Sequence, residues 1–498
     1  MPIRNPQPEG AREAHNQQWA LLALLLVSFA IRLHALLQLP GFVDEGNHLL
    51  WAAEVWQGRI IFPFSTAKPL EIFYLALLMP FRNPLWMGRF GSVLMSVVTL
   101  TGLWALARRL GNGNIGLWAA IFYAFTPWTF FHERTAVADP LLAAVVVLTM
   151  WGATVWVKRP SAQRSIGLAA CLFALPLVKL SAAPFMVLPI VIVVLKNRSA
   201  WRGLWLPYFL AIGGVMVVLT PAMLRHDVFG ELTIRATAGQ TTSWIDFVLR
   251  NIGDVFEWSA VYLGLVGPMI VIGAALAVMR RSAVGLTALA GGLLGLSPML
   301  FPATLFPRYD LPVLALGSLL AGEAVQLLLG LARPHPLRRS IDAVVFAAAA
   351  LPFAAFAAQA YSDPSQLKLA DIDRAQHVWE WSSGYGIREA AAYVAKLTSN
   401  NSQPAVVYSA NLATHVIARL YWPSEANGET YLLWDSAALD VIDTVASGKP
   451  TYLIVDTSRD TASFEGLTIN PHESARFERP SGGQPVVVYR LLNEPFQP

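Results

Sequence analysis

The sequence predicts an α-helical protein that crosses a membrane many times and ends in a small α/β domain. Of its 498 residues, 55% are hydrophobic and only 14% are charged. A soluble globular protein carries about 25% charged residues. Long apolar runs repeat from Trp19 to Ala360 and then stop. This composition excludes a disordered chain, a coiled coil and an ordinary soluble enzyme.

The apolar runs predict about eleven membrane spans, because a span needs roughly 20 mostly apolar residues to cross the hydrocarbon layer. Some of these runs are short and adjacent. We expect no cleavable signal peptide, since the run after Trp19 continues as a span without a small-residue cleavage site. The spans are predicted at residues 19–39, 90–107, 115–131, 140–157, 165–178, 183–195, 204–222, 255–279, 283–301, 311–331 and 341–360.

The positions of lysine and arginine predict the orientation. If residues 1–18 lie in the cytoplasm, the segments on that side collect the basic residues, and nearly every carboxylate of the membrane half falls on the other side. Cytoplasmic loops carry such an excess of basic residues. We therefore expect an odd number of spans in the plasma membrane. The cytoplasmic cations are Arg4, Arg12, Arg108, Arg109, Lys158, Arg159, Arg164, Lys196, Arg198, Arg202, Arg280, Arg281, Arg333, Arg338 and Arg339.

Residues 361–498 differ in composition and, in this orientation, are extracytoplasmic. They are polar, and strand-like runs alternate with helix-like ones, which indicates a small α/β domain. The strand-like runs are 405–409, 451–455 and 485–491, and the helix-like runs are 388–397 and 411–420.

Cysteine content and net charge exclude several classes of site. The single cysteine, Cys171, excludes a disulfide scaffold, a cysteine-based zinc site and an iron–sulfur cluster. The net charge of +4 is small and dispersed, so we expect no nucleic-acid partner.

The long loop after the first span, residues 40–89, carries the first candidate site residues. Asp44 and Glu45 are adjacent carboxylates at the mouth of a span. Residues 49–56 are apolar on one face and rich in aromatic residues, which predicts an amphipathic helix in the membrane interface. A surface helix packed on its neighbours is the alternative. Lys68-Pro69 and Arg89 follow before the second span.

The second outer loop, residues 132–139, holds four ionisable side chains between two spans. These are His132, Glu133, Arg134 and Asp139. Ionisable groups close to the membrane are costly unless they pair or have a function. The alternative to a functional site is a solvated loop in which Arg134 pairs with Glu133 or Asp139.

Three later residues are also candidates. Lys179 lies between two short apolar segments, where a lysine can extend to the lipid headgroups. Arg308 and Tyr309 open the tenth span from the outer side. A guanidinium group binds two phosphate oxygens at once, although an interfacial anchor is the alternative.

Carboxylates and cations on one side of a membrane suit one kind of chemistry. A carboxylate removes a proton from an acceptor hydroxyl or amine, or orients that group. Cations stabilise a phosphate leaving group attached to a lipid. The pattern fits the transfer of a glycosyl group from a polyprenyl phosphate.

The order of these motifs resembles the GT-C glycosyltransferases. The match rests on Asp44-Glu45 after the first span, Lys68-Pro69, Arg89 before the second span and Asp139 in the second outer loop, and it extends over about residues 19–320. The closest resemblance is to glycosyltransferase family 39, taken to include the protein mannosyltransferases and the lipid A aminoarabinose transferases. The run Trp381-Ser382-Ser383-Gly384-Tyr385-Gly386 also looks like bacterial members.

The resemblance implies a multi-span fold, an interfacial active site, a polyprenyl-phosphate sugar donor and inverting transfer. Asp44 is then the base or the acceptor-positioning carboxylate. The resemblance also matches Asp139 to the family's second-loop acid and assigns the donor phosphate to Lys68 and Arg89, with Arg308 as a looser candidate. We add further candidates from their positions in the sequence: Glu45 for catalysis, Lys179 for the donor phosphate, and His132, Glu133 and Tyr309 for substrate contact.

Two features depart from the family pattern. Relatives often have Lys-Pro-Pro where this chain has Lys68-Pro69-Leu70, and the large extra lumenal module of eukaryotic protein mannosyltransferases is missing. Family members differ in metal dependence, so a divalent metal stays open. The sequence determines neither the sugar nor the acceptor, which is a lipid, a glycan or a protein.

Two other functions are alternatives. A transporter or flippase with a soluble cap places its ionisable groups near the membrane midplane, often in paired repeats. Here mid-span charges are scarce and no repeat is evident. A scaffold that has lost activity is the second alternative, and the presence of both Asp44 and Asp139 weighs against it.

Overall fold

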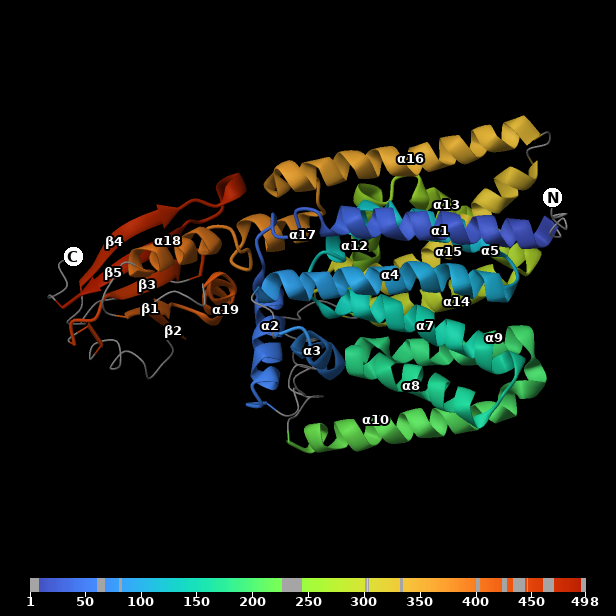
Figure 1. Cartoon of the computed structure of the whole chain (residues 1–498), viewed down its shortest axis with the longest axis horizontal. Coiled ribbons are helices and arrows are strands. Elements are labelled where there is room, and N and C mark those ends of the chain that lie inside the picture. Colours follow the sequence, from blue (N-terminus) through green and yellow to red (C-terminus); the bar gives the residue numbers. More distant parts are fainter. Residues whose placement is uncertain are drawn as a thin grey trace, which may run out of the picture. The chain divides into compact units, whose positions relative to one another are not determined.

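The structure is a computed structural model, and it divides the chain into two compact units (Figure 1). The first comprises Met1–Leu36, Val55–Leu78 and Gly88–Tyr361, and the second comprises Leu37–Glu54, Met79–Met87 and Ser362–Pro498. The residues described are 9–60, 68–79, 83–225, 244–300, 302, 304–331, 335–399, 404–422, 428–432, 444–445, 447–459 and 470–493.

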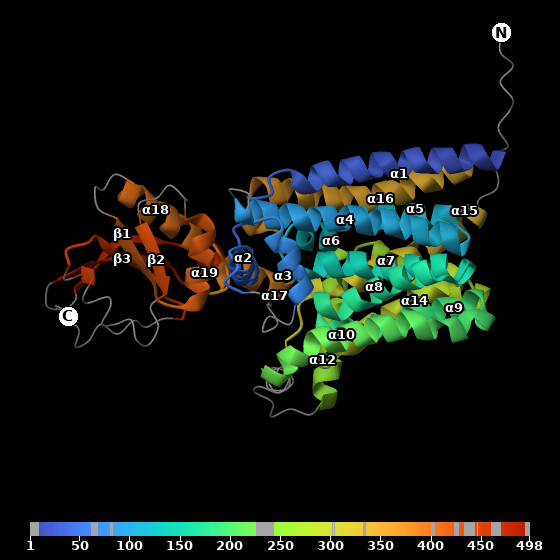
Figure 2. The ribbon, with the colours of Figure 1, turned by 60° about the horizontal axis from the view of Figure 1, so that its bottom comes forward.

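The first unit is a bundle of apolar helices whose long members run roughly parallel to one another (Figure 1, Figure 2). Its helices are α1 (Glu9–Leu33), α3 (Pro69–Ala76), α4 (Pro84–Leu110), α5 (Gly113–Ala124), α6 (Pro127–His132), α7 (Ala138–Lys158), α8 (Ala162–Val178), α9 (Leu188–Lys196), α10 (Trp205–Arg225), α12 (Trp244–Tyr262), α13 (Val266–Arg280), α14 (Ala283–Leu296), α15 (Leu311–Leu331) and α16 (His335–Ser362), with the short 3-10 segments η2 (Leu180–Val187), η3 (Arg198–Leu204), η4 (Ser297–Leu300) and η5 (Pro307–Asp310).

Every predicted span falls on one or two of these helices. Within the described residues, seven helices are long and apolar enough to cross a membrane, or up to eight if one bent pair counts as a span, and three shorter apolar helices accompany them. The predicted span at 255–279 is instead two helices, α12 and α13, and the chain bends by 119° between them. The chain turns there at Gly264, whose φ of +49° suits glycine because it has no Cβ.

Helix α15 lies at the centre of the bundle, and its residues from Leu314 to Val325 are all buried. It packs against α5, α7, α13 and α14. Glycine makes two of these approaches close. A Cβ at Gly273 of α13 would lie 1.8 Å from the Leu320 carbonyl oxygen, and one at Gly322 would lie 2.5 Å from that of Ile115. Small residues allow helix backbones in a membrane to approach in this way.

The second unit contains the predicted α/β domain. Its sheet has the strand order β2-β1-β3-β5-β4, in which β1 is parallel to β2 and β3, and β5 is antiparallel to β3 and β4. The elements are α17 (Asp371–Arg374), α18 (Ile387–Ser399), α19 (Leu412–Tyr421), β1 (Ala405–Ser409), β2 (Gly428–Leu432), β3 (Thr451–Asp456), β4 (Asn470–Phe477) and β5 (Val486–Leu492).

The start of the first outer loop belongs to this second unit rather than to the bundle, which differs from the boundary expected at residue 360. Helix α2 (Val43–Trp56) begins where the Val43 amide donates to the Ser382 carbonyl oxygen at 3.0 Å. A Cβ at Gly384 would lie 2.0 Å from the Gly41 carbonyl oxygen, so only glycine fits there. The Ser382–Gly386 run quoted from the sequence thus holds the base of α2.

A buried ion pair stabilises the second unit and yields a testable prediction. Arg479 donates to both carboxylate oxygens of Asp456 at 2.9 Å, and both side chains are almost fully buried. Arg479→Met leaves a buried carboxylate without its partner, so we expect this unit to lose about 3–5 kcal/mol of stability. Thermal unfolding of the full-length protein, followed through the unit's sheet signal, measures this.

The matched control is Arg476→Met. Arg476 pairs with Glu473 on the surface, where the two side chains are 47% and 43% exposed, and exposed pairs contribute little. Equal shifts of the unfolding midpoint for the two variants would contradict the role given to Arg479.

Candidate functional site

The candidate site in the bundle centres on Asp139. This residue lies in the first turn of α7, where a negative charge is favoured by the helix dipole. Lys179 Nζ lies 2.8 Å from Asp139 Oδ1, and Arg308 Nε lies 3.8 Å from Asp139 Oδ2. We call Asp139, Lys179, Arg308, Tyr309 and Asp310 the Asp139 cluster.

A break between two helices places Lys179 in the cluster. Helix α8 ends at Val178, two residues after its internal Pro176, and Lys179 itself is extended before η2 begins at Leu180. Its side chain is only 13% exposed and pairs with a carboxylate. The alternative weighed from the sequence, a lysine extending to the headgroups, is therefore wrong.

The 3-10 turn η5 places the next three members. Trp128 Nε1 donates to the Pro307 carbonyl oxygen at 2.9 Å and so fixes the start of the turn. Lys179 Nζ lies 3.3 Å from the centre of the Tyr309 ring, and Arg308 Cζ lies 5.4 Å from it. The tyrosine ring therefore stands beside two cations, a favourable contact with its π face.

Asp310 is the member that the sequence analysis did not single out. It is 2% exposed, and neither of its carboxylate oxygens has a hydrogen-bond partner among the described residues. Asp310 directly follows Arg308 and Tyr309 in the sequence, and this position could have marked it as a candidate site residue. A buried polar group left without a partner is rare and calls for an explanation, such as a ligand.

The charges of the cluster favour an anion. Lys68, which precedes α3, lies within electrostatic range of Asp139. Three cations (Lys68, Lys179 and Arg308) therefore face two carboxylates (Asp139 and Asp310). Lysine and arginine together are the usual ligands of a phosphate group in proteins.

Glu133 forms a buried ion pair, and its predicted contact with substrate stays a prediction. Arg32 Nε lies 2.7 Å from Glu133 Oε2, and neither side chain is exposed. Arg32 also donates to Ser28 Oγ at 2.7 Å and to the Ala124 carbonyl oxygen at 3.1 Å. Burial raises the pKa of the Glu133 carboxyl, and the neighbouring Arg32 offsets part of that rise. The pair fastens α1 to the second outer loop.

Arg134 does not form either of the pairs weighed from the sequence. Its guanidinium donates to the carbonyl oxygens of Arg32, His34 and Ala35 at 2.8–3.1 Å, while Glu133 and Asp139 pair elsewhere. Arg134 therefore supports the chain where α1 ends.

Arg89 and His132, two further predicted site residues, are buried in the bundle. Arg89 is 1% exposed and donates to the Leu36 carbonyl oxygen at 2.8 Å. His132 is fully buried, 6.3 Å from the Tyr262 ring. Their predicted roles with donor and substrate stay predictions.

Asp44 and Glu45 lie in the first turn of α2, in the second unit. Glu45 is fully buried, and its Oε2 accepts from the Phe42 amide at 3.2 Å, so it caps its own helix. Asp44 is partly exposed. The structure thus separates the two adjacent carboxylates into a structural one and one that solvent reaches.

In the described part of the chain, no three histidine, cysteine, aspartate or glutamate side chains lie close enough to bind one metal ion together.

Comparisons with known proteins agree with this architecture. Residues 68–224, which include Lys68, Asp139 and Lys179, match the family model described as dolichyl-phosphate-mannose-protein mannosyltransferase. The crystal structure of ArnT from Cupriavidus metallidurans bound to undecaprenyl phosphate aligns with a TM-score of 0.57 at 15% identity, over 94% of this chain and 97% of that one. The chain has the GT-C fold.

Two further structures have the same fold. ArnT from the same organism in the apo state aligns with a TM-score of 0.57 at 14% identity, over 96% of this chain and 98% of that one. The Archaeoglobus fulgidus oligosaccharyltransferase in complex with Zn and sulfate aligns with a TM-score of 0.50 at 10% identity, over 88% and 68%. A search of curated protein sequences gave no match.

The resemblance to GT-C glycosyltransferases drawn from the sequence is confirmed by the family model and the fold together. The predicted fold class, a helical membrane bundle with a small C-terminal α/β domain, is confirmed as well.

The Arg32–Glu133 pair yields a prediction about stability. Glu133→Gln leaves a fully buried guanidinium without its counter-charge, so we expect a loss of about 3 kcal/mol or more. A double variant, Arg32→Met with Glu133→Leu, removes both charges and should recover part of that loss. Thermal unfolding of the purified full-length protein measures both.

Glu389→Gln serves as the control. Glu389 pairs with Arg388 on the surface, with the side chains 36% and 34% exposed, and should shift the midpoint little. If Glu133→Gln behaved like this control, the pair would not hold α1 in place.

Proposed function

We propose that the protein transfers a sugar from a polyprenyl-phosphate donor to an acceptor on the outer face of the membrane. The observation that carries the proposal is the Asp139 cluster, in which Lys179 and Arg308 are held on Asp139 within a bundle of the GT-C fold. The structure of ArnT bound to undecaprenyl phosphate supports the class of donor.

In the proposed reaction, the bond between the sugar's anomeric carbon and the phosphate oxygen breaks, and the acceptor's oxygen or nitrogen bonds to that carbon from the opposite face. Polyprenyl phosphate leaves with the bonding electrons, so negative charge grows on its oxygens. Lys179, Arg308 and Lys68 stabilise that charge. The acceptor's proton passes to Asp44, which the resemblance assigns as base.

The placement of the charges favours an enzyme over a transporter. Transport proteins keep ionisable groups near the membrane midplane. In this bundle Asp139 and Arg308 lie in the first turns of their spans. Two charged residues within the predicted spans already have partners. Arg32 pairs with Glu133, and Glu323 accepts a hydrogen bond from the Ser282 hydroxyl.

The orientation and the acceptor complete the proposal. The basic residues predict a cytoplasmic N-terminus and an extracytoplasmic C-terminal domain in the plasma membrane. The acceptor is a lipid, a glycan or a protein, and the second unit, which carries Asp44, is the part we expect to contact it.

Turnover with defined donors tests the function. Purified protein in vesicles is offered a panel of polyprenyl-phosphate sugars, and release of sugar from the carrier is measured with and without added membrane extract. We expect turnover with one donor, and we expect Asp44→Asn to reduce it by at least about a hundredfold, because removal of a catalytic base costs about that much.

Glu54→Gln, in the same helix as Asp44, is the matched control and should retain turnover. Folding of each variant is checked by its thermal midpoint. Normal turnover by Asp44→Asn would refute its role, and no turnover with any donor from folded wild-type protein would favour the transporter or the scaffold.

A further inference from the structure

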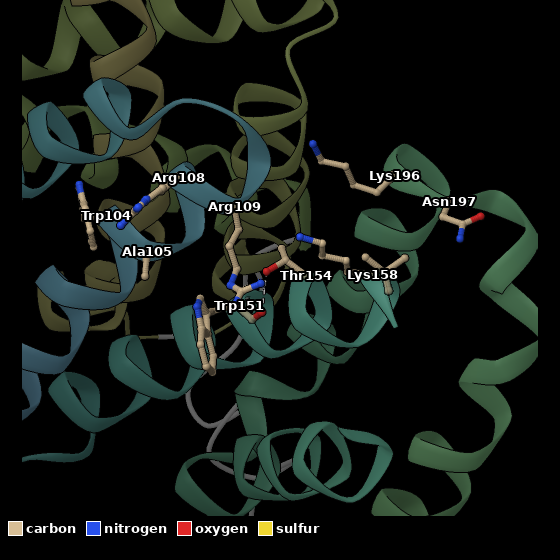
Figure 3. Close-up of a pocket in the computed structure, with 10 residues that line it drawn as sticks. Trp104, Ala105, Arg108, Arg109, Trp151, Thr154, Lys158, Lys196 and Asn197 are labelled. Carbon is tan, nitrogen blue, oxygen red and sulfur yellow. Dashed lines mark hydrogen bonds between the residues drawn. The ribbon is translucent and has the colours of Figure 1, made fainter. Parts of the chain in front are cut away.

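A second charged pocket lies in the bundle, formed by α4, α7 and the end of α9 (Figure 3). Its volume is about 760 Å³. Figure 3 shows side chains from both α4 and α7 lining it. The lining residues are Trp104, Ala105, Arg108, Arg109, Trp151, Thr154, Val157, Lys158, Lys196 and Asn197.

This pocket lies at the opposite end of the helices from the Asp139 cluster. Asp139 is in the first turn of α7 and Lys158 is in its last. A helix of 21 residues is about 30 Å long, which is the thickness of the hydrocarbon layer. The pocket is therefore separate from the proposed donor site, on the side that the basic residues assign to the cytoplasm.

The pocket is strongly cationic. Four of its ten lining residues are arginine or lysine, and its lining includes no carboxylate. Within the residues that the structure describes, none of these four cations forms an ion pair, whereas Lys179 and Arg308 both lie beside Asp139. Such a concentration of unbalanced charge attracts an anion.

Two tryptophans hold the arginine heads in place. Arg108 Cζ lies 5.0 Å from the centre of the Trp104 ring, and Arg109 Cζ lies 5.5 Å from that of Trp151. Both contacts are of cation–π type. Lys196 Nζ donates to the Leu110 carbonyl oxygen at 2.7 Å, which draws the end of α9 onto the end of α4.

Trp104 is a buried part of the pocket wall. Trp104 is 9% exposed, and its indole N–H has no acceptor among the described residues. A buried N–H without an acceptor costs free energy.

We propose that this pocket binds the phosphate headgroup of an anionic membrane phospholipid. Tryptophan is enriched at the membrane–water interface because its ring is apolar and its N–H is polar. Basic pockets between membrane helices on the cytoplasmic side suit anionic headgroups. The tryptophan rings offer an apolar surface. An acyl chain needs such a surface, whereas a soluble phosphate does not.

Lipid retention by the purified full-length protein tests the proposal. Native mass spectrometry measures retention of phosphatidylglycerol and of zwitterionic phosphatidylcholine. We expect wild-type protein to retain phosphatidylglycerol preferentially, and Arg108→Gln with Arg109→Gln to lower that retention about tenfold. Both arginines are exposed, so the variant should fold, which its thermal midpoint checks.

The matched control is Arg338→Gln with Arg339→Gln, an adjacent exposed pair in the first turns of α16. It removes the same charge outside the pocket and should retain phosphatidylglycerol as wild type does.

Three outcomes would overturn the proposal. Equal losses of phosphatidylglycerol retention in both arginine double variants would show a general effect of charge. Equal retention of phosphatidylglycerol and phosphatidylcholine would show that the pocket does not select an anionic headgroup. Displacement of the lipid by inorganic phosphate at equal concentration would assign the pocket to a soluble anion. Because the readout is lipid retention, it is independent of sugar transfer.

Discussion

The contact between Lys179 and Asp139 is the interaction on which the candidate site depends. It joins the break after α8 to the first turn of α7, and Arg308 completes it from η5. A buried carboxylate is costly unless it is paired, so Asp139 fixes where two cations stand. Asp310 lies buried beside them without a hydrogen-bond partner in the described part of the chain. The arrangement holds positive charge in place before any substrate arrives.

Structural and functional charges divide between neighbouring positions. Glu133 serves the packing of α1 through Arg32, six residues before Asp139. Glu45 caps α2, whereas Asp44, one residue earlier, is partly exposed. Adjacent carboxylates thus take different roles because the helix turn directs one side chain inward and the other outward. Helix α7 begins at the Asp139 cluster, and its other end, about 30 Å away, lines the cationic pocket together with the end of α4.

The sequence predicted the helices of the bundle well because their apolar runs are long. It predicted β1, β3 and β5 from buried apolar runs, but not β4, whose residues Asn470–Phe477 are mostly polar and solvent-facing. It named Asp139, Lys179 and Arg308 without their contacts, because the partners lie 40 or more residues apart. The pairing of Arg32 with Glu133, across 101 residues, was beyond reach for the same reason.

The most direct test of the central claim is the affinity of the full-length protein for undecaprenyl phosphate. If Lys179 and Arg308 hold the carrier phosphate, Lys179→Met should weaken binding at least about tenfold. Asp139→Asn leaves both cations present but no longer held in place, so it should weaken binding less than Lys179→Met does. Lys396→Met, on the surface of α18, is the control and should have no effect. Equal binding by wild-type protein and Lys179→Met would contradict the account.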